Sequence, residues 1–236
     1  MKRWAMKAMA GLSFLIFLFP NATGAPALAK SESPFILSLG EDSYIRKGSI
    51  EGATGAQFLK ELGAKKLEEM QVVILSNIDY PSLPDRVRDG LVDYLRNGGA
   101  LLMTGGARSF GSGGYGNANL AVILPLQILY PRDWQPTRRG LIEVLVPSHP
   151  VFSGLDPLKM PLVDSFNNLG MGNGSILAQF SKFERQPLMA ERAVGNGLAF
   201  GIAFNMAEIS SQWPEGDRFS HNLIQYLLAK SAIRPR

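Results

Sequence analysis

The 236-residue sequence contains no cysteine and only two histidines. Without cysteine the chain has no disulfide, no thiolate nucleophile, no cysteine-ligated zinc and no lipid attached at a processed cysteine. The two histidines, His149 and His221, show no metal-ligand spacing, and the acidic residues are scattered. The sequence therefore predicts no cofactor and no metal site, although a carboxylate-only site for Ca²⁺ or Mg²⁺ stays open.

Residues 1–29 are typical of a signal peptide. A positively charged start precedes an apolar stretch over residues 8–19, which is shorter than the roughly 20 residues of a membrane-spanning helix. Ala-Leu-Ala at residues 27–29 then matches a cleavage site. We expect a mature periplasmic or secreted chain that begins at Lys30 and has no membrane span; the alternative is an uncleaved N-terminal anchor.

Removal of this segment changes the charge of the chain. It deletes three positive charges and no negative one, so the formal net charge falls from +4 to +1, which is 21 basic minus 20 acidic residues. A chain this close to neutral lacks the clustered basic surface of a nucleic-acid-binding protein. Residues 30–236 are numerous enough to bury a core, and we expect them to form a single domain.

Apolar runs in the first half predict a parallel α/β arrangement. The β-prone run at 72–75 and the run at 100–103 are typical of strands that are buried on both faces. Between them, apolar residues of 85–97 repeat at helical spacing. A strand, helix, strand order with short connections predicts a right-handed parallel unit.

The second half is less regular. Gly195-Asn196-Gly197 between two apolar runs predicts a tight antiparallel hairpin. Residues 218–230 have the apolar spacing of a final helix, whereas 164–174 are polar and are interpreted as a connection. The other expected elements are a helix over 53–62 and strands over 35–37, 141–146, 175–180, 188–194 and 198–204.

The stretch TGGARSFGSGGYG, residues 104–116, follows the second predicted strand and contains six glycines. Residues 111–116 match the pattern G-x-G-x-x-G, but about seven residues separate them from the strand, and no acidic residue follows where a dinucleotide's ribose would bind. A P-loop needs a lysine, and residues 104–118 contain none. These observations disfavour a dinucleotide site and exclude a P-loop.

Ser109 lies in an imperfect G-x-S-x-G motif, the signature of a serine nucleophile. That motif needs the serine at the apex of a strand-to-helix turn and a histidine base within reach, and Ser109 comes late after the strand. His221 falls off the apolar stripe of its helix and is interpreted as solvated. His149 precedes a proline and is interpreted as a turn residue.

Two segments carry a more specific pattern: VVILSN (72–77) and LVDYLRNGGALLMTGGARSFGSGGYGNANLAVILPL (91–126). The second contains a glycine pair, a hydrophobic strand, G-G-x-x-S-F-G-x-G-G-Y and a short helix that ends in L-P. With weaker pieces at 149–156, 193–205 and 213–229, they resemble bacterial glutamine amidotransferase-like proteins of the class I glutamine amidotransferase-like superfamily. The resemblance implies a three-layer, flavodoxin-like α/β sandwich with a largely parallel sheet plus an antiparallel hairpin in the C-terminal half.

The resemblance also implies what an active enzyme would need: a cysteine on the turn after the buried strand, a histidine base and an orienting glutamate. The place of that cysteine falls at Thr104 or Gly105, and neither supplies a thiolate. The His-x-Glu pair is absent as well, since neither histidine has glutamate two positions later. The family resemblance is thus no evidence for glutaminase activity, and we expect a pseudoenzyme.

We expect a binding or assembly module of the cell envelope that lacks catalytic residues. Its ligand surface is predicted at the carboxyl ends of the parallel strands, where open α/β sheets bind ligands. Arg108 could hold a carboxylate or phosphate, while Phe110 and Tyr115 could either stack on a partner or fold back and pack the loop. The predicted ligand-binding residues are Asn77, Thr104, Gly105, Gly106, Arg108, Ser109, Phe110 and Tyr115.

The expected partner is an envelope protein or a small anionic ligand. Trp213 is expected either at the same edge or packed against the last helix. The alternative function is a hydrolase or amidotransferase-like enzyme that uses Ser109 or Thr104 in place of cysteine.

Overall fold

The structure is a computed structural model that describes residues 33–45, 49–182 and 185–234. The expectations for residues 1–29 lie outside the described residues. The described residues belong to one compact unit, Glu32–Arg236.

Nine strands form the central sheet within the described residues. They are β1 (Phe35–Gly40), β2 (Gln57–Leu59), β3 (Val72–Ser76), β4 (Ala100–Thr104), β6 (Trp134–Val144), β7 (Leu162–Asn167), β9 (Ser175–Phe180), β10 (Pro187–Val194) and β11 (Gly197–Ile202). Their order is β2-β1-β3-β4-β11-β10-β9-β6-β7. Pairing is parallel from β2 to β11 and antiparallel from β11 to β7. Strands β5 (Leu126–Ile128) and β8 (Leu169–Met171) form a separate antiparallel pair.

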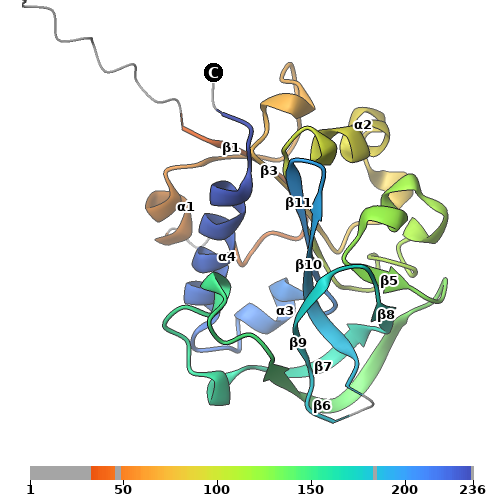
Figure 1. Cartoon of the computed structure of the whole chain (residues 1–236), viewed down its shortest axis with the longest axis vertical. Helices are drawn as coiled ribbons and strands as arrows, with labels where there is room; N and C mark the ends of the chain where they lie inside the picture. The colour runs from red at the N-terminus through yellow and green to blue at the C-terminus, as the bar shows by residue number, and fades with distance from the viewer. Residues whose placement is uncertain (1–32, 46–48, 183–184, 235–236) are drawn as a thin grey trace, which may run out of the picture. The chain divides into compact units, whose positions relative to one another are not determined.

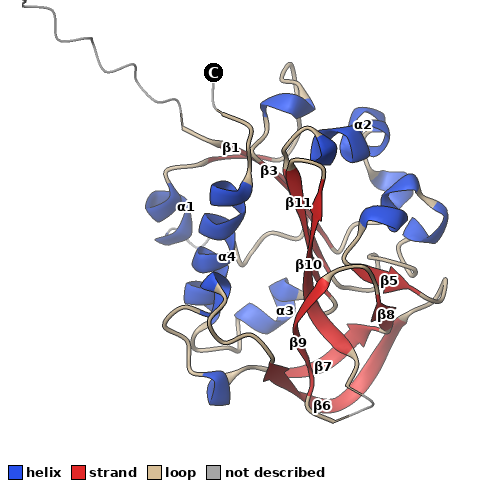
Figure 2. Cartoon of the chain, viewed as in Figure 1, coloured by secondary structure: helices blue, strands red, loops and turns tan. Residues whose placement is uncertain are grey.

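Helices cover both faces of the sheet. Helices α1 (Ser49–Thr54) and α4 (Gly216–Lys230) lie on one side, and α2 (Asp85–Arg96) lies on the other (Figures 1 and 2). Helix α3 (Met206–Ser210) follows β11 beyond the carboxyl ends of the parallel strands. The predicted three-layer α/β class is therefore confirmed, and the antiparallel part extends from the β10–β11 hairpin through β9 and β6 to β7.

The buried residues agree with the apolar patterns of the sequence. Every residue of β3 and β4 is buried, as expected for strands covered on both faces. Helix α2 buries Val87, Leu91, Tyr94 and Leu95, which is the stripe that its spacing predicts. The expected tight hairpin is present, and its loop has two residues because Val194 pairs with Gly197. None of the described helices has the length and apolar character needed to cross a membrane.

Two local predictions are wrong. Residues 53–62 were expected to be helical, but α1 ends at Thr54, and 57–59 form β2, which pairs in parallel with β1. The pairing with β1 outweighs a moderate local helix preference. The polar residues 164–174 were expected to be a connection, but they contribute to β7 and β8. Strand β7 lies at the edge of the sheet, where polar side chains such as Asp164 can stay exposed.

Candidate functional site

The glycine-rich loop after β4 is held from inside by Asn167, the last residue of β7. Its Oδ1 accepts a hydrogen bond from the Gly106 amide at 2.9 Å. Its Nδ2 lies 2.8 Å from Asp133 Oδ1, 3.2 Å from the Gly106 carbonyl oxygen and 3.4 Å from the Ser109 carbonyl oxygen. Because Asn167 is fully buried, these bonds form in a low-dielectric environment, where losing one leaves a costly unpaired group.

Asp133 satisfies the amides at the far end of the same loop. Its two carboxylate oxygens accept hydrogen bonds from the amides of Gly111 and Ser112, each at 2.9 Å. Ser112 Oγ in turn accepts from the amides of Asp133 and Trp134, at 3.0 and 2.9 Å. Asp133 is 1% exposed. The loop amides that an external anion would need are thus occupied by a carboxylate of the chain itself.

The two aromatic residues of the loop point inward. Phe110 and Tyr115 are both fully buried, and Phe110 adopts a left-handed backbone conformation with φ 48°. The Tyr115 hydroxyl donates to the Ile78 carbonyl oxygen at 2.9 Å, and its ring packs edge-on against Tyr80 at 5.3 Å. Burial raises the pKa of Tyr115. The prediction that these rings stack on a partner is wrong, and the alternative of packing the loop holds.

The turn directly after β4 has no space for an additional side chain. A Cβ atom at Gly105 would lie 2.4 Å from the Ala203 carbonyl oxygen and 2.7 Å from Asn167 Oδ1. Gly106 has φ 149°, and a Cβ there would lie 2.2 Å from Asn77 Oδ1. Both glycines therefore serve close backbone packing, and Gly105 is one of the two positions at which the resemblance places the nucleophile.

The two hydroxyls considered as substitute nucleophiles are buried. Thr104 Oγ1 and Ser76 Oγ share a hydrogen bond of 2.7 Å inside the sheet. Ser109 is fully buried, and its Oγ has no hydrogen-bond partner in the described part of the chain. A substrate carbonyl cannot approach either oxygen in this arrangement.

A polar cluster lies at the carboxyl ends of the parallel strands and consists of Glu41, Asn77, Asn205 and Glu208. Glu41 follows β1, and its two carboxylate oxygens accept from Asn77 Nδ2 at 2.7 Å and Asn205 Nδ2 at 2.9 Å. Asn205 Nδ2 also donates to Glu208 Oε1 at 3.2 Å, and its Oδ1 caps α3 by accepting from the Ala207 amide at 2.9 Å. We call these four residues the edge cluster.

Arg108 joins the edge cluster to the glycine-rich loop. Its backbone amide donates to Asn77 Oδ1 at 2.9 Å, and its guanidinium forms an ion pair with Asp79, with Nε at 2.8 Å. A hydrogen bond from Ser82 and the bonds from Arg108 hold the pKa of Asp79 below its ordinary value. The Arg108 side chain is 57% exposed. Its guanidinium therefore reaches solvent, although it already has the Asp79 carboxylate as a partner.

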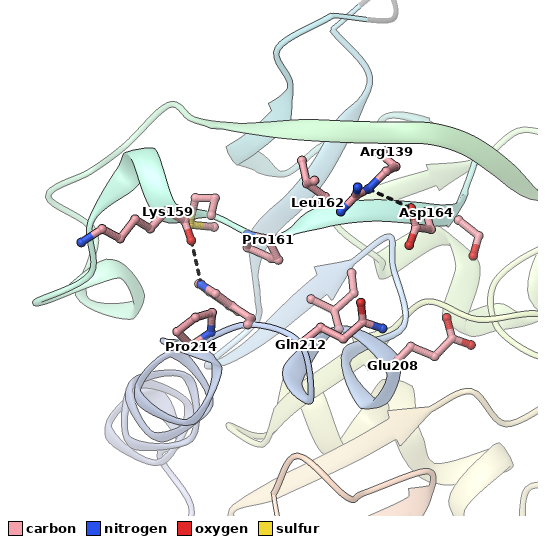
Figure 3. A pocket seen from close by; sticks show the side chains of 12 residues that line it. Arg139, Lys159, Pro161, Leu162, Asp164, Glu208, Gln212 and Pro214 are labelled. Carbon is pink, nitrogen blue, oxygen red and sulfur yellow. Dashed lines mark hydrogen bonds and ion pairs between the residues drawn. The ribbon is translucent and has the colours of Figure 1, made fainter.

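A pocket of about 240 Å³ lies next to the edge cluster (Figure 3). Arg139 of β6 and Asp164 of β7 face it from one side, and Glu208 and Gln212 face it from the other (Figure 3). Arg139 Nε and Asp164 Oδ1 are 4.0 Å apart. The lining also includes Lys159, Met160, Pro161, Leu162, Ser165, Ile209, Trp213 and Pro214. Since Glu208 belongs to both features, the pocket continues the edge cluster.

Both expectations for Trp213 hold. Its indole Nε1 donates to the Lys159 carbonyl oxygen at 3.0 Å in the wall of the pocket. Its ring packs against Phe219 of α4, with the ring centroids 5.1 Å apart. Trp213 thus connects the pocket wall to the last helix.

The predicted site residues are therefore close in space but differ in access. Of the eight, Asn77 and Arg108 place polar side-chain atoms near the surface, while Thr104, Ser109, Phe110 and Tyr115 are buried. No sequence pattern indicated Asp133 and Asn167, which shape the loop, or the pocket lined by Arg139, Asp164 and Gln212. These residues are isolated polar positions with no motif around them, so the sequence offered no signal beyond their polarity.

His149 is more than the turn residue that the sequence suggested. It is the N-cap of a short 3-10 turn, and its Nδ1 accepts from the Val151 amide at 3.4 Å. That bond places the proton of the neutral ring on Nε2, which faces Glu191 Oε2 at 3.4 Å. The ring also packs on Tyr226, with centroids 4.6 Å apart. The side chain is 9% exposed, so it links the turn to β10 and α4.

We expect His149 to make stability depend on pH. Burial lowers its pKa below the ordinary value of 6.5, and Glu191 and Lys230 act on it in opposite directions. The folded chain then binds fewer protons than the unfolded chain below about pH 6.5, so the free energy of unfolding falls as the pH decreases through that window. Melting temperatures between about pH 7.5 and pH 5.5 should fall more for wild type than for His149→Phe, which keeps the aromatic packing. Parallel pH profiles would contradict this role.

In the described residues, no group of three or more histidine, aspartate or glutamate side chains is arranged to hold a metal ion. This holds for the two histidines and for the edge cluster alike.

The layers, the strand order and the glycine turn after β4 define an α/β sandwich of the amidotransferase-like class. A family model described as "Putative glutamine amidotransferase" matches residues 56–228, and the chain belongs to this family. The resemblance seen in the sequence is thereby confirmed. No curated protein matches the chain.

Solved structures share the fold at low sequence identity. Two cytoplasmic proteins from Salmonella typhimurium are 17% and 16% identical, with TM-scores of 0.68 and 0.67. Each alignment covers 82% of this chain, and 99% and 98% of the respective relative. A ThuA-like protein from Bacteroides uniformis is 16% identical with a TM-score of 0.59, covering 90% of this chain and 99% of that one. At these identities the likeness concerns the fold alone.

Proposed function

We propose that the protein is an exported, non-catalytic binding or assembly module of the cell envelope. Export is supported by the composition of residues 1–29. The non-catalytic part rests on one observation: the Ala203 carbonyl oxygen leaves no space for a side chain at Gly105, one of the two positions, with Thr104, where the resemblance places the nucleophile. The buried hydroxyls of Thr104 and Ser109 support it further.

The proposed ligand site is the pocket of Figure 3 together with the edge cluster. The charged lining of the pocket consists of two basic residues, Arg139 and Lys159, and two acidic residues, Asp164 and Glu208. Gln212 adds an amide that can both donate and accept hydrogen bonds. This lining favours a small polar ligand with donors and acceptors. An acidic group on such a ligand would meet Arg139, or Arg108 farther along the edge.

Equilibrium dialysis of the purified protein against a small-molecule extract of the envelope, followed by mass spectrometry, tests the pocket. We expect wild type to retain a polar molecule that Gln212→Ala loses, because the variant removes an exposed amide from the lining without disturbing the core. Gln225→Ala on α4 is the matched control, since Gln225 lies outside the pocket. Equal retention by wild type and Gln212→Ala would contradict the pocket.

Arg108→Ala adds a second readout to the same experiment. An exposed ion pair such as Arg108–Asp79 contributes about 0–1 kcal/mol, so the melting temperature should fall by at most about 2–4 °C. Retention of the ligand should nevertheless weaken. Equal loss of binding and of stability would make Arg108 a structural residue, and release of ammonia from glutamine by the pure protein would overturn the non-catalytic proposal.

A further inference from the structure

Two neighbouring hollows form one groove that is separate from the pocket of Figure 3. The first, of about 360 Å³, is lined by apolar residues, among them Val122, Ile128 and Met171, and by polar residues such as Gln127. The second, of about 540 Å³, is lined by Ser175, Glu191, Tyr226 and Lys230, among others. Asn173 and Arg192 line both hollows. Figure 1 shows β9 and β10 between helix α4 and the β5–β8 pair. Helix α4 contributes Tyr226 and Lys230 to the second hollow, and the β5–β8 pair contributes Ile128 and Met171 to the first.

One end of the groove is apolar and open to solvent. Val122 belongs to the 3-10 turn η4 (Asn119–Ile123) and is 71% exposed, and Met171 at the end of β8 is 68% exposed. Ile128 of β5 and Leu124 line the same hollow. Large exposed apolar side chains that gather at one hollow mark an interaction surface more often than scattered ones do.

Within the part of the chain that the structure describes, two cations line the groove without a carboxylate partner, Arg192 between the two hollows and Lys230 at the end away from Val122. In the described residues, neither Arg192 nor Lys230 has a carboxylate within ion-pairing distance: Arg192 Nη1 donates to the Val122 carbonyl oxygen at 2.6 Å, and Lys230 Nζ lies 5.3 Å from the centre of the Tyr226 ring. The single carboxylate in the lining, Glu191, accepts from the Tyr226 hydroxyl at 2.7 Å and faces His149. Glu191 is thus committed to other partners, and the two cations remain available.

We propose that this groove binds a short extended segment of a partner protein, in which an acidic side chain follows or precedes a bulky apolar one by a few residues. The apolar side chain would lie against Val122 and Met171, and the carboxylate would meet Lys230, with Arg192 between the two. The positive charge of the groove beside apolar side chains favours a peptide that carries both an acidic and an apolar residue. A nucleic acid would require many more basic groups than these two. The proposal does not depend on the ligand pocket. It assigns the groove as the surface through which the protein would bind a partner in an assembly.

Selection of random heptapeptides by display on the purified protein tests the proposal. We expect the enriched peptides to combine Asp or Glu with Leu, Ile, Met or Phe, because the groove offers cations beside apolar surface. A fluorescein-labelled copy of an enriched peptide should bind at least about tenfold more weakly to Lys230→Glu and to Val122→Asp. Both side chains are exposed, so the variants should fold, which circular dichroism checks.

Two matched control variants introduce the same types of substitution at exposed positions outside the groove. Arg86→Glu on α2 reverses an exposed charge, and Leu158→Asp alters an apolar side chain that is 95% exposed; neither residue lines the groove. Both should bind the peptide as wild type does. The proposal is overturned by an absence of enriched peptides, by peptides without an acidic residue, or by equal binding to Lys230→Glu and wild type. It is also overturned by a dimer that Val122→Asp dissociates, or by binding to phosphatidylglycerol vesicles without peptide binding.

Discussion

Asn167→Leu should destabilise the fold by about 3 kcal/mol or more, although the two side chains are similar in size. The substitution leaves the buried Gly106 amide without an acceptor, which costs about 1–3 kcal/mol. It also removes one hydrogen bond each from the Ser109 carbonyl oxygen and the Asp133 carboxylate, which keep other partners, and each lost bond costs about 0.5–1.5 kcal/mol. For a domain of this size, that corresponds to a fall in melting temperature of roughly 6–12 °C or more. Thermal unfolding followed by circular dichroism measures it.

Asn117→Leu is the matched control for this variant. Asn117 lies in the 3-10 turn at residues 115–117 and is exposed, so the change should stay within about 0.5 kcal/mol. If Asn167→Leu melted within a degree or two of wild type, Asn167 would not be the residue that holds the loop.

Gly105→Ala should be similarly destabilising, by roughly 3 kcal/mol. Its Cβ would approach the Ala203 carbonyl oxygen to 2.4 Å, and a backbone atom held between β11 and α3 cannot move aside as a flexible side chain would. Gly105→Cys adds a sulfur atom to the same clash, so the cysteine of active relatives cannot be restored here without refolding the turn. Urea titration of the alanine variant gives the loss in unfolding free energy.

Gly52→Ala in α1 is the comparison for Gly105→Ala, since no atom lies within 4 Å of its added Cβ and alanine favours a helix. It should be neutral or slightly stabilising. Thr104→Cys, nearly the same size as threonine, should fold and still release no ammonia from glutamine, because residue 104 is fully buried. A Gly105→Ala protein as stable as wild type would show that the turn yields, and would remove the main support for the non-catalytic proposal.

The regular elements could be predicted where the local pattern and the tertiary packing agree. The stripe of α2, the hairpin loop at Gly195 and the buried strands β3 and β4 follow directly from apolar spacing and turn residues. The prediction of a helix over 53–62 was wrong, because Gln57–Leu59 pairs with β1. No local sequence pattern indicates this pairing. Strand β7 was missed because an edge strand can carry polar residues.

The candidate site was predictable only in its location. The carboxyl edge of the parallel strands follows from the strand order, and Asn77 and Arg108 lie there as expected. The residues that shape the site come from distant segments: Asn167 is 61 residues from Gly106, and Asp133 is 22 residues from Gly111. Their contacts depend on the register of β6 and β7 against the rest of the sheet, which no spacing in the sequence encodes.

The sequence by itself determined which chemistry the chain lacks: with no cysteine, no folded arrangement can present a thiolate to glutamine. It also determined the class of fold. Strands that are apolar throughout need cover on both faces, and the helices with one apolar stripe supply that cover. Tertiary structure alone decided that the glycine-rich loop is filled by its own side chains. Phe110 and Tyr115 are buried in a loop that Asn167 and Asp133 hold, and these two residues come from segments that only the sheet brings to the loop.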